Sequence, residues 1–499
     1  MRNRLEMLKT VLTIVVLAAG TPGGSGQAAD TGASPGSGTA RRPNIVFLLA
    51  DQWRAKATGY AGDANVKTPH LDRLAQESIC FRNAVSVCPV CTPYRAALMT
   101  SRYPTSTGMF LNDAQLPDSE VCVAELLKQA GYVTAYIGKW HLDGHGRSSY
   151  IPPERRRGWD YWKAAECDHN YLHSHYYEGD SAEKRFWEGY DAFAQTKDAQ
   201  TYLCAHAQTG PFVLFVSYGV PHFPHQTALP QFQKLYPPEK IRLLPNVPEE
   251  MQAKARQEAQ GYYAHCTALD QCVGEVLATL AETGLAENTI LVFTSDHGEM
   301  LGSHGCPPYM KQVPWDEAAH VPLLLRYPAV HGHHGRVVET SLTTPDIFPT
   351  LFGLAGITVP KTFEGEDLSG LARGAQAASD RAALYMGVAP FAGKGHNKEY
   401  RAVRTSRYTY VRGLDGPWLL FDDQRDPCQM DNLADKPEFA ALGNDLNSRL
   451  QAELKRIGDD FRPAQYYIET WGYELAPHGS VAYTPNAKVQ SPKRRQAGK

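Results

Sequence analysis

Four segments of the chain share one pattern, a continuous hydrophobic run that ends in polar or charged side chains. The runs are NIVFLLADQW, YVTAYIGKWH, PFVLFVSYGVPHFPH and TILVFTSDHGEM. Runs that are apolar on both faces are typical of buried, mostly parallel strands. Because open α/β sheets bind ligands at the carboxyl ends of such strands, we expect the polar residues that follow the runs to form one shared site. These residues are Asp51, Gln52, Lys139, His141, His222, Asp296 and His297.

Helical patterns lie between these runs. Thr68 followed by Pro69 is typical of a helix N-terminus, and a second helix is expected to stop at Gly131. A long helix is expected from about residue 248 to residue 285, before the last of the four runs. The composition changes after GLARGAQAASDRA, and YRAVRTSRYTYVRG and WLLFDDQRDPCQMDNLAD are typical of short antiparallel strands. This order of elements predicts an α/β protein with a smaller C-terminal unit.

The N-terminus has the pattern of a secretory signal peptide. Arg2, Arg4 and Lys9 precede the apolar run VLTIVVLAAG, and small residues follow it. Because that run is shorter than the roughly 20 residues of a membrane span, we expect an exported protein, periplasmic or secreted, with no membrane span after signal cleavage. The predicted segments are a signal peptide (1–29), a flexible linker (30–42), a catalytic domain (43–375), a C-terminal subdomain (376–475) and a basic tail (476–499).

The bulk composition is that of an ordinary globular protein. The 499 residues are 43% hydrophobic and carry a formal net charge of -3, so nothing favours nucleic acid as a partner. The 10 cysteines are unevenly spaced and do not match a disulfide framework, although a few disulfides would be compatible with export. Cys88 and Cys91 have the CxxC spacing of a zinc or redox site. No second pair of Cys or His stands at matching spacing, so another chemistry is favoured for Cys91.

The stretch CTPYRAALMTSR predicts a helix whose N-terminus lies beside Cys91. Thr92 is expected to cap this helix, and Pro93 suits its first position. Free backbone N–H groups and the helix dipole attract an oxyanion at such a point. Arg95 follows Cys91 by four residues, so its guanidinium can reach the same face. The pattern therefore places a nucleophile and a fixed positive charge one turn apart.

These segments together resemble a known family. CTPYR fits the C-x-P-x-R signature of type I sulfatases, and CTPYRAALMTSRYP fits the longer pattern. The segments NIVFLLADQW, GKWHL, VPHFPH, TSDHGEMLGSHG and YMKQVPWDEAAHVPLLLRYP follow in the family's order, so the resemblance covers most of the chain. It implies an alkaline-phosphatase-like α/β sandwich with a large mixed sheet and a smaller C-terminal antiparallel α+β subdomain. It also implies hydrolysis of sulfate esters, and we expect a sulfated carbohydrate as the substrate.

The resemblance also implies a modified residue and a metal. In the family a maturase oxidises the cysteine to formylglycine (3-oxoalanine), and one divalent metal, usually Ca²⁺, is bound. Two ligand positions here, Gln52 and His297, differ from those of many sulfatases and occur in relatives that cleave phosphonate or phosphate esters. Another divalent metal, a phosphonate or phosphate ester hydrolase, and a glycan-binding homologue with unmodified Cys91 are therefore alternatives. Carried over by position, the metal ligands are Asp51, Gln52, Cys91, Asp296 and His297.

The resemblance assigns the catalytic roles by position. Arg95 and Lys139 would stabilise the formylglycine and the developing charge. Lys311 and His222 would neutralise or protonate the departing alkoxide. His141 would take the proton that releases sulfate. The catalytic set is Cys91, Arg95, Lys139, His141, His222 and Lys311.

Two further polar clusters have more than one interpretation. The segment ECDHNYLHSHYYEGD holds His169, His173 and His175 among aromatic residues, which could line a sugar pocket, bind a second metal or form a polar loop. The three arginines of residues 155–157 could meet an anionic polymer or be ordinary surface charge.

Overall fold

The computed structural model describes residues 42–391 and 395–483, which belong to one compact unit. The expected signal peptide (1–29), nearly all of the expected linker and the tail from residue 484 lie outside the described residues. Within the described residues, no helix combines the length and the apolar character needed to cross a lipid bilayer. The expected boundary between residues 375 and 376 stays a prediction.

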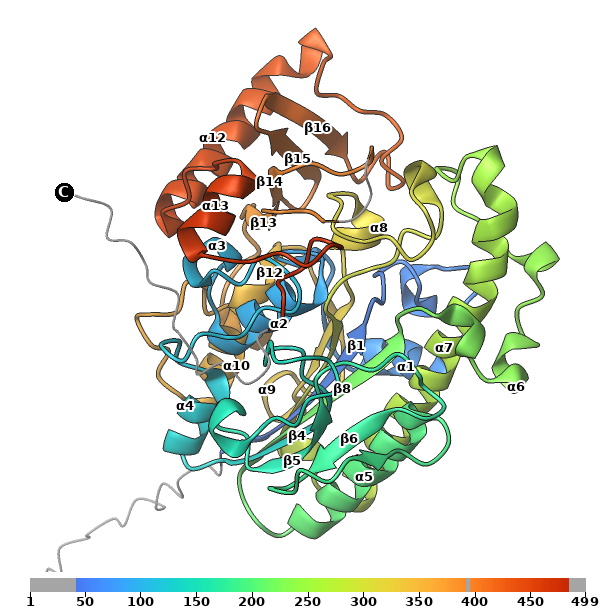
Figure 1. The fold of residues 1–499 in the computed structure, drawn as a ribbon, viewed down its shortest axis with the longest axis vertical. Coiled ribbons are helices and arrows are strands. Elements are labelled where there is room, and N and C mark those ends of the chain that lie inside the picture. The colour runs from blue at the N-terminus through green and yellow to red at the C-terminus, as the bar shows by residue number, and fades with distance from the viewer. Residues whose placement is uncertain (1–41, 392–394, 484–499) are drawn as a thin grey trace, which may run out of the picture. The chain divides into compact units, whose positions relative to one another are not determined.

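A ten-stranded mixed sheet forms the centre of this unit, with the strand order β11-β2-β10-β9-β1-β8-β4-β5-β6-β7 (Figure 1). Its four central strands are β9 (Thr289–Ser295), β1 (Asn44–Asp51), β8 (Phe212–Pro221) and β4 (Val133–Lys139). They are neighbours and run parallel. These are the four apolar runs of the sequence, so the prediction of buried parallel strands is confirmed. Their carboxyl ends meet at one edge of the sheet, as expected.

Shorter strands extend the sheet on both sides. β10 runs antiparallel to β9, and β6 runs antiparallel to β5, which makes the sheet mixed. Two further strands, β3 and β12, form a small parallel pair of their own. The bounds are β2 (Ile79–Phe81), β3 (Ala84–Val85), β5 (Tyr161–Ala165), β6 (His175–Glu178), β7 (Arg185–Phe186), β10 (Leu323–Arg326), β11 (Arg336–Val338) and β12 (Leu342–Thr343).

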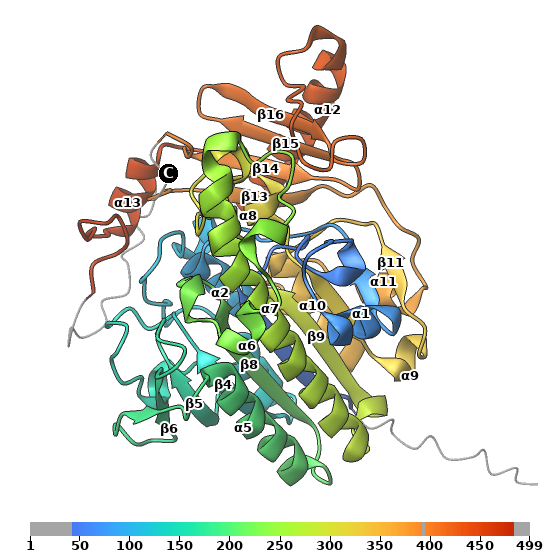
Figure 2. The same ribbon diagram turned by 90° about the vertical axis from the view of Figure 1, so that its right-hand side faces the viewer.

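Helices cover both faces of the sheet because each central strand buries alternate side chains on opposite sides. On one face, Val46 and Leu48 pack against α1 (Pro69–Gln76), α5 (Asp191–His206) and α7 (Glu249–Glu282). Figure 2 shows the long helix α7 crossing this face. The expected helix start at Pro69 and the expected long helix before β9 are confirmed.

On the other face, Phe47 packs against α2 (Cys91–Thr100), α4 (Val123–Gln129) and α10 (Ile347–Ala355). Its ring stacks on Phe348 of α10 at a centroid distance of 5.7 Å. All residues of α2 are buried, so this helix has no face exposed to solvent. It reaches from the core to the edge where the strands end.

The C-terminal part contains a separate antiparallel sheet, as expected. Its four strands are β13 (Ala383–Gly387), β14 (Tyr400–Arg404), β15 (Tyr408–Gly413) and β16 (Gly416–Asp422). Helix α12 (Ala440–Ile457) contacts β14 and β15. The remaining helices are α3 (Pro104–Thr107), α6 (Pro230–Gln233), α8 (Asp316–Ala319), α9 (Pro328–His331), α11 (Ser369–Arg373) and α13 (Ala464–Trp471).

All 10 cysteines lie in the described residues as free thiols, and the disulfides that export would have allowed are not formed.

Candidate active site

Cys91 is the first residue of helix α2 and is buried below the edge where the central strands end. The helix follows Val90, whose backbone is extended. The expected cap by Thr92 is wrong, because Thr92 lies inside the helix and its hydroxyl donates to the carbonyl of His141 at 3.1 Å. Its backbone N–H is satisfied by the side chain of Asn112 at 3.0 Å. Cys91 therefore lies at the helix N-terminus itself, where the dipole favours negative charge.

Four groups that could hold a metal converge from three elements. One ligand atom each of Asp51, Cys91, Asp296 and His297 lie within 4.8 Å of one another, and all four residues are buried. Nε2 of His297 lies 3.3 Å from the sulfur of Cys91 and 3.5 Å from Oδ1 of Asp296. Nδ1 of His297 donates to the carbonyl of Gly298 at 3.1 Å, so the lone pair on Nε2 points into the cluster. Two carboxylates and one oriented imidazole fit a divalent metal.

Gln52 borders this cluster. Its backbone N–H donates to Oδ1 of Asp296 at 3.0 Å. Its side-chain oxygen accepts a bond from Nζ of Lys311 at 2.9 Å, and its amide nitrogen donates to Glu299 and to the carbonyl of Tyr309. The side chain thus links the cluster to Lys311, and the role of Gln52 as a ligand stays a prediction.

Two cations neutralise the buried carboxylates. The Arg95 guanidinium, also buried, donates to Asp51 at 3.2 Å and to Asp296 at 3.1 Å, and it is held by Ser217 at 2.7 Å. Nζ of Lys139 donates to Asp51 at 2.6 Å. Burial would raise the pKa of Asp51, but the positive charges of Lys139 and Arg95 keep it below its usual value. Asp51 is therefore ionised and available to a metal.

The same positive surroundings act on Cys91. Burial would raise the pKa of its thiol, yet Lys139, Lys311 and His297 hold that pKa well below its usual value. This point of the protein therefore stabilises a negative charge at position 91.

His141 is oriented by Asp113, a residue that the sequence analysis did not single out. Its Nε2 lies 2.9 Å from Oδ1 of Asp113, and both side chains are buried. Because a carboxylate only accepts, Nε2 donates to Asp113, and Nδ1 has no hydrogen-bond partner among the described residues. Burial would lower the pKa of His141, but Cys167 and Asp113 raise it to about 9. Nothing in the residues around Asp113 marked it, because its partners are distant in sequence: Ser480 donates to it at 2.7 Å.

Lys311 and His222, predicted as a pair, are brought together. Nζ of Lys311 lies 2.7 Å from Nε2 of His222, while Nδ1 of His222 lies 2.6 Å from the carbonyl of Phe223. Nδ1 must donate to that carbonyl, so Nε2 accepts from Lys311. Burial and Lys311 lower the pKa of His222 well below its usual value, and the ring is neutral. Lys311 is also 3.6 Å from the sulfur of Cys91, so its amine can donate to the group at that position.

A cavity of about 250 Å³ opens over Cys91. None of the described residues that line it is acidic, so it favours an anionic ligand. Its aromatic side chains can pack against a sugar ring. The basic, imidazole and aromatic lining residues are Lys139, Arg147, Lys311, His141, His169, His222, Phe223, Tyr309 and Phe391.

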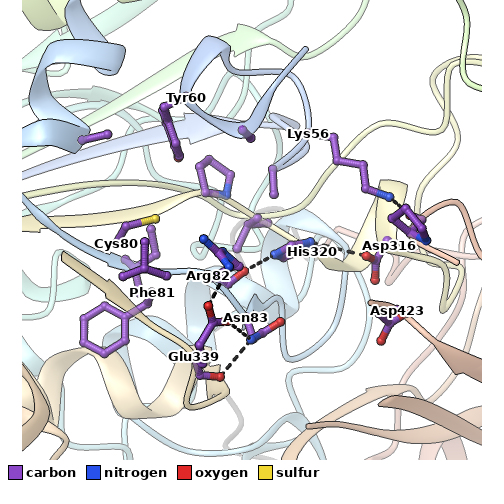
Figure 3. Close-up of a pocket in the computed structure, with 18 of the residues that line it drawn as sticks. Lys56, Tyr60, Cys80, Phe81, Arg82, Asn83, Asp316, His320, Glu339 and Asp423 are labelled. Atoms are coloured by element: carbon purple, nitrogen blue, oxygen red, sulfur yellow. Dashed lines mark hydrogen bonds and ion pairs between the residues drawn. The ribbon is translucent and has the colours of Figure 1, made fainter. Parts of the chain in front are cut away.

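A larger cavity of about 870 Å³ contains none of the predicted site residues (Figure 3). Its charges are mixed: Arg82 pairs with Glu339 at 2.6 Å, and Arg404 pairs with Asp316. His320 bonds to the backbone carbonyl of Arg82 at 2.6 Å. Because acidic groups offset the basic ones, this cavity lacks the anion preference of the smaller one.

The histidine-rich segment contributes one residue to the smaller cavity. The ring of His169 stacks on that of His222 at 4.4 Å and lines the cavity. His173 instead stacks on Phe186 at 4.2 Å, and His175 bonds to Asp168. Residues 155–157 bond to neighbouring loops, with Arg155 on Asp143 at 2.6 Å, Arg156 on Asp180 at 3.0 Å and Arg157 on the carbonyl of Pro117 at 2.8 Å.

Comparison with known proteins places the chain in a family. The sulfatase profile matches residues 43–357, and the profile of the N-sulphoglucosamine sulphohydrolase C-terminal region matches residues 302–456. The ulvan-active sulfatase of Formosa agariphila is 52% identical over 433 residues, which cover 87% of this chain and 85% of that protein. The endo-4-O-sulfatase of Bacteroides thetaiotaomicron is 29% identical over 481 residues, covering 84% and 93%.

A solved structure agrees with these sequence matches. The YidJ protein of Bacteroides fragilis has a TM-score of 0.77 and 31% identity, and the match covers 85% of this chain and 98% of that one. The matches include both the large sheet and the C-terminal strands, so they do not depend on the CTPYR motif alone. The protein therefore belongs to the sulfatase family, hydrolyses sulfate esters and has the alkaline-phosphatase-like fold that its motifs predicted.

Proposed function

We propose that this sulfatase removes sulfate from a sulfated glycan, using formylglycine made from Cys91 and one divalent metal. The observation that carries the proposal is the position of Cys91, which lies among two carboxylates and an imidazole at the base of a cavity whose described lining residues include no acidic side chain. The names of the two relatives, an ulvan-active sulfatase and an endo-4-O-sulfatase, support a glycan substrate.

Cys91 itself requires a partner for its conversion. Because its side chain is 1% exposed, we expect the maturase to act on the chain before it folds. The pattern of residues 1–29 supports export of the mature enzyme to the periplasm or beyond. Detection of the protein, lacking these residues, in the periplasmic or culture fraction tests that part of the proposal.

The metal would be held by Asp51, Asp296, His297 and the group at position 91, with Gln52 beside them. When bound, the metal polarises the sulfate oxygens, and the hydrated aldehyde at position 91 supplies the nucleophilic hydroxyl. Calcium prefers oxygen donors, whereas the imidazole of His297 also suits a transition metal. Metal analysis of the purified protein decides between them.

The surrounding side chains bind charge and carry protons. Lys139 and Lys311 face the cavity and would hold the sulfate oxygens. Arg95 holds the carboxylates of Asp51 and Asp296 in place. His141 would accept a proton on Nδ1, the atom that Asp113 leaves free.

Lys311 would give a proton to the departing alkoxide. Lys311 and His222 were expected to neutralise or protonate this alkoxide together. Because Nε2 of His222 accepts from Lys311, the proposal gives the proton to Lys311 and a positioning role to His222. This arrangement assigns the two proton transfers to different pairs, the base to His141 with Asp113 and the acid to Lys311 with His222.

The test compares 4-nitrophenyl sulfate with 4-nitrophenyl phosphate and a phenylphosphonate ester, on protein whose Cys91 conversion is measured by mass spectrometry. We expect the sulfate ester to be preferred and its turnover to be lost in Cys91→Ala. Preference for the phosphonate or phosphate ester would assign the alternative hydrolase. An unconverted Cys91 together with glycan binding would assign the binding homologue.

A further inference from the structure

Arg147 lines the smaller cavity but has no part in the chemistry derived above. Its side chain is 41% exposed, whereas that of Lys139 is 5% exposed. Arg147 therefore lies at the mouth of the cavity and Lys139 at its base. A fixed positive charge at the mouth is separate from the cations that face the reacting sulfate.

The guanidinium of Arg147 is held in place by an ion pair that leaves some of its N–H donors free. Its Nε donates to the hydroxyl of Tyr483 at 3.0 Å, while Nε and Nη2 each lie 3.4 Å from an oxygen of Asp113. The carboxylate of Asp113 also accepts hydrogen bonds from His141 at 2.9 Å and from Ser480 at 2.7 Å, both shorter than its contacts with Arg147. Nη1 has no hydrogen bond to any described residue, so several of the five N–H donors of this guanidinium stay available to a ligand.

The size of the cavity determines what could reach Arg147. At about 250 Å³ it is smaller than the roughly 300–1,000 Å³ of typical ligand sites, so it holds about one sugar ring with its sulfate. The next sugar of a glycan must lie at the mouth, beside Arg147. Tyr309 also lines the cavity, is 41% exposed and packs 5.4 Å from the ring of Phe223, which gives that sugar an aromatic surface.

We propose that Arg147 is a specificity-determining residue that binds a second anionic group of the glycan, a carboxylate or a second sulfate ester near the sulfate that is cleaved. The planar fork of a guanidinium matches both groups through paired hydrogen bonds. This inference rests on the proposed glycan sulfatase function and names a class of substrate for it. The enzyme would then distinguish polyanionic glycans from neutral sugars that carry one sulfate.

A purely structural role for Arg147 predicts different kinetics. If Arg147 only kept Asp113 in place, its replacement would reduce kcat to a similar extent with every substrate, because Asp113 acts through His141. Recognition of a second anion predicts instead a rise in KM that is confined to substrates carrying that anion.

The experiment compares wild type, Arg147→Gln and Arg147→Lys, with Arg82→Gln as the matched control. Arg82 is an exposed arginine that pairs with a glutamate in the larger cavity, so the control makes the same change of charge elsewhere. The substrates are a monosulfated disaccharide with a neighbouring uronic acid, its carboxyl-reduced form, a disulfated disaccharide and 4-nitrophenyl sulfate. Thermal melting of each variant confirms that it is folded.

We expect wild type to prefer one of the doubly anionic disaccharides over the carboxyl-reduced form by at least about 10-fold in kcat/KM. Arg147→Gln should lose about 10- to 100-fold in kcat/KM on that disaccharide, mainly through a higher KM. The loss in kcat/KM on 4-nitrophenyl sulfate should be smaller by a factor of at least about 10. Arg147→Lys should recover part of the loss, and Arg82→Gln should match wild type. The disaccharide with the larger loss identifies the second anion as carboxylate or sulfate.

Equal loss on all substrates in Arg147→Gln would overturn the inference and leave the sulfatase assignment intact. So would wild-type cleavage of the carboxyl-reduced disaccharide at the same rate as both doubly anionic disaccharides. Failure of converted wild-type enzyme on every sulfate ester would overturn the proposed function, and this inference with it.

Discussion

Replacing Asp113 with Asn would test whether the orientation of His141 controls the rate. Asp113 has φ of 64°, a left-handed conformation that Asn adopts as readily as Asp, so the backbone is preserved. Asn also has nearly the same shape as Asp. The substitution therefore removes the negative charge that faces Nε2 of His141, and with it the charge that Ser480 and Arg147 contact.

The expected loss follows from the geometry. The bond between His141 and Asp113 is 2.9 Å long, and the two side chains are 2% and 1% exposed, so water cannot replace it. Hydrogen bonds to charged groups contribute about 1.5–3 kcal/mol, against about 0.5–1.5 kcal/mol for neutral pairs. Losing the charge of Asp113 should raise the activation free energy by roughly 1–2 kcal/mol, because His141 is positive in the transition state. This corresponds to a fall in kcat of about 5- to 30-fold.

The pH dependence should change in the same variant. Asp113 and Cys167 raise the pKa of His141 to about 9 against the effect of burial. Burial lowers the pKa of His141, and without the carboxylate charge less opposes this effect, so the pKa should fall by about one unit. Because His141 acts as a base when it is deprotonated, the limb of the kcat profile that reports it should move to lower pH.

The assay is steady-state hydrolysis of 4-nitrophenyl sulfate between pH 5 and pH 10 by wild type, Asp113→Asn and Ser480→Ala. Ser480 also bonds to Asp113, at 2.7 Å, but its removal leaves the charge intact and should change kcat by less than about 3-fold. An Asp113→Asn enzyme with wild-type kcat and an unmoved pH limb would refute the proposed role of this pair.

Three further predictions concern the metal, the acid and the core. Asp296→Asn removes one negative charge from the ligand cluster, so metal analysis should show less bound metal in the variant than in wild type. A chelator should therefore lower the Tm of wild type more than that of the variant. Equal metal content in the two proteins would contradict the assignment of Asp296 as a ligand. Lys311→Ala should lose about 100-fold or more on a sugar sulfate but less than about 10-fold on 4-nitrophenyl sulfate, whose leaving group needs no proton; equal losses would exclude Lys311 as the acid. Leu48→Ala, fully buried in β1, should lower the free energy of unfolding by about 2–5 kcal/mol in urea titrations, and a smaller change would mean that the cavity collapses.

Much of the fold could be predicted because its signals are local. The run before Asp51 and the run before Asp296 are apolar at every position, and both strands are buried in the sheet centre as a result. The spacing of Cys91 and Arg95 likewise predicted that both lie on one helix turn. The cap at Thr92 was predicted wrongly, because a tertiary bond to His141 occupies its hydroxyl.

The sequence by itself determined the strands, the helix at Cys91 and the family to which these motifs belong, since each depends on neighbouring residues or on a short motif. Only the tertiary structure decided which distant side chains complete the site. Asp113 and Arg147 come from loops with no periodic pattern, and their partners Ser480 and Tyr483 lie more than 300 residues further along the chain. Such pairs are formed by the packing of the whole chain, which places loops together according to the register of the sheet and not according to their own residues.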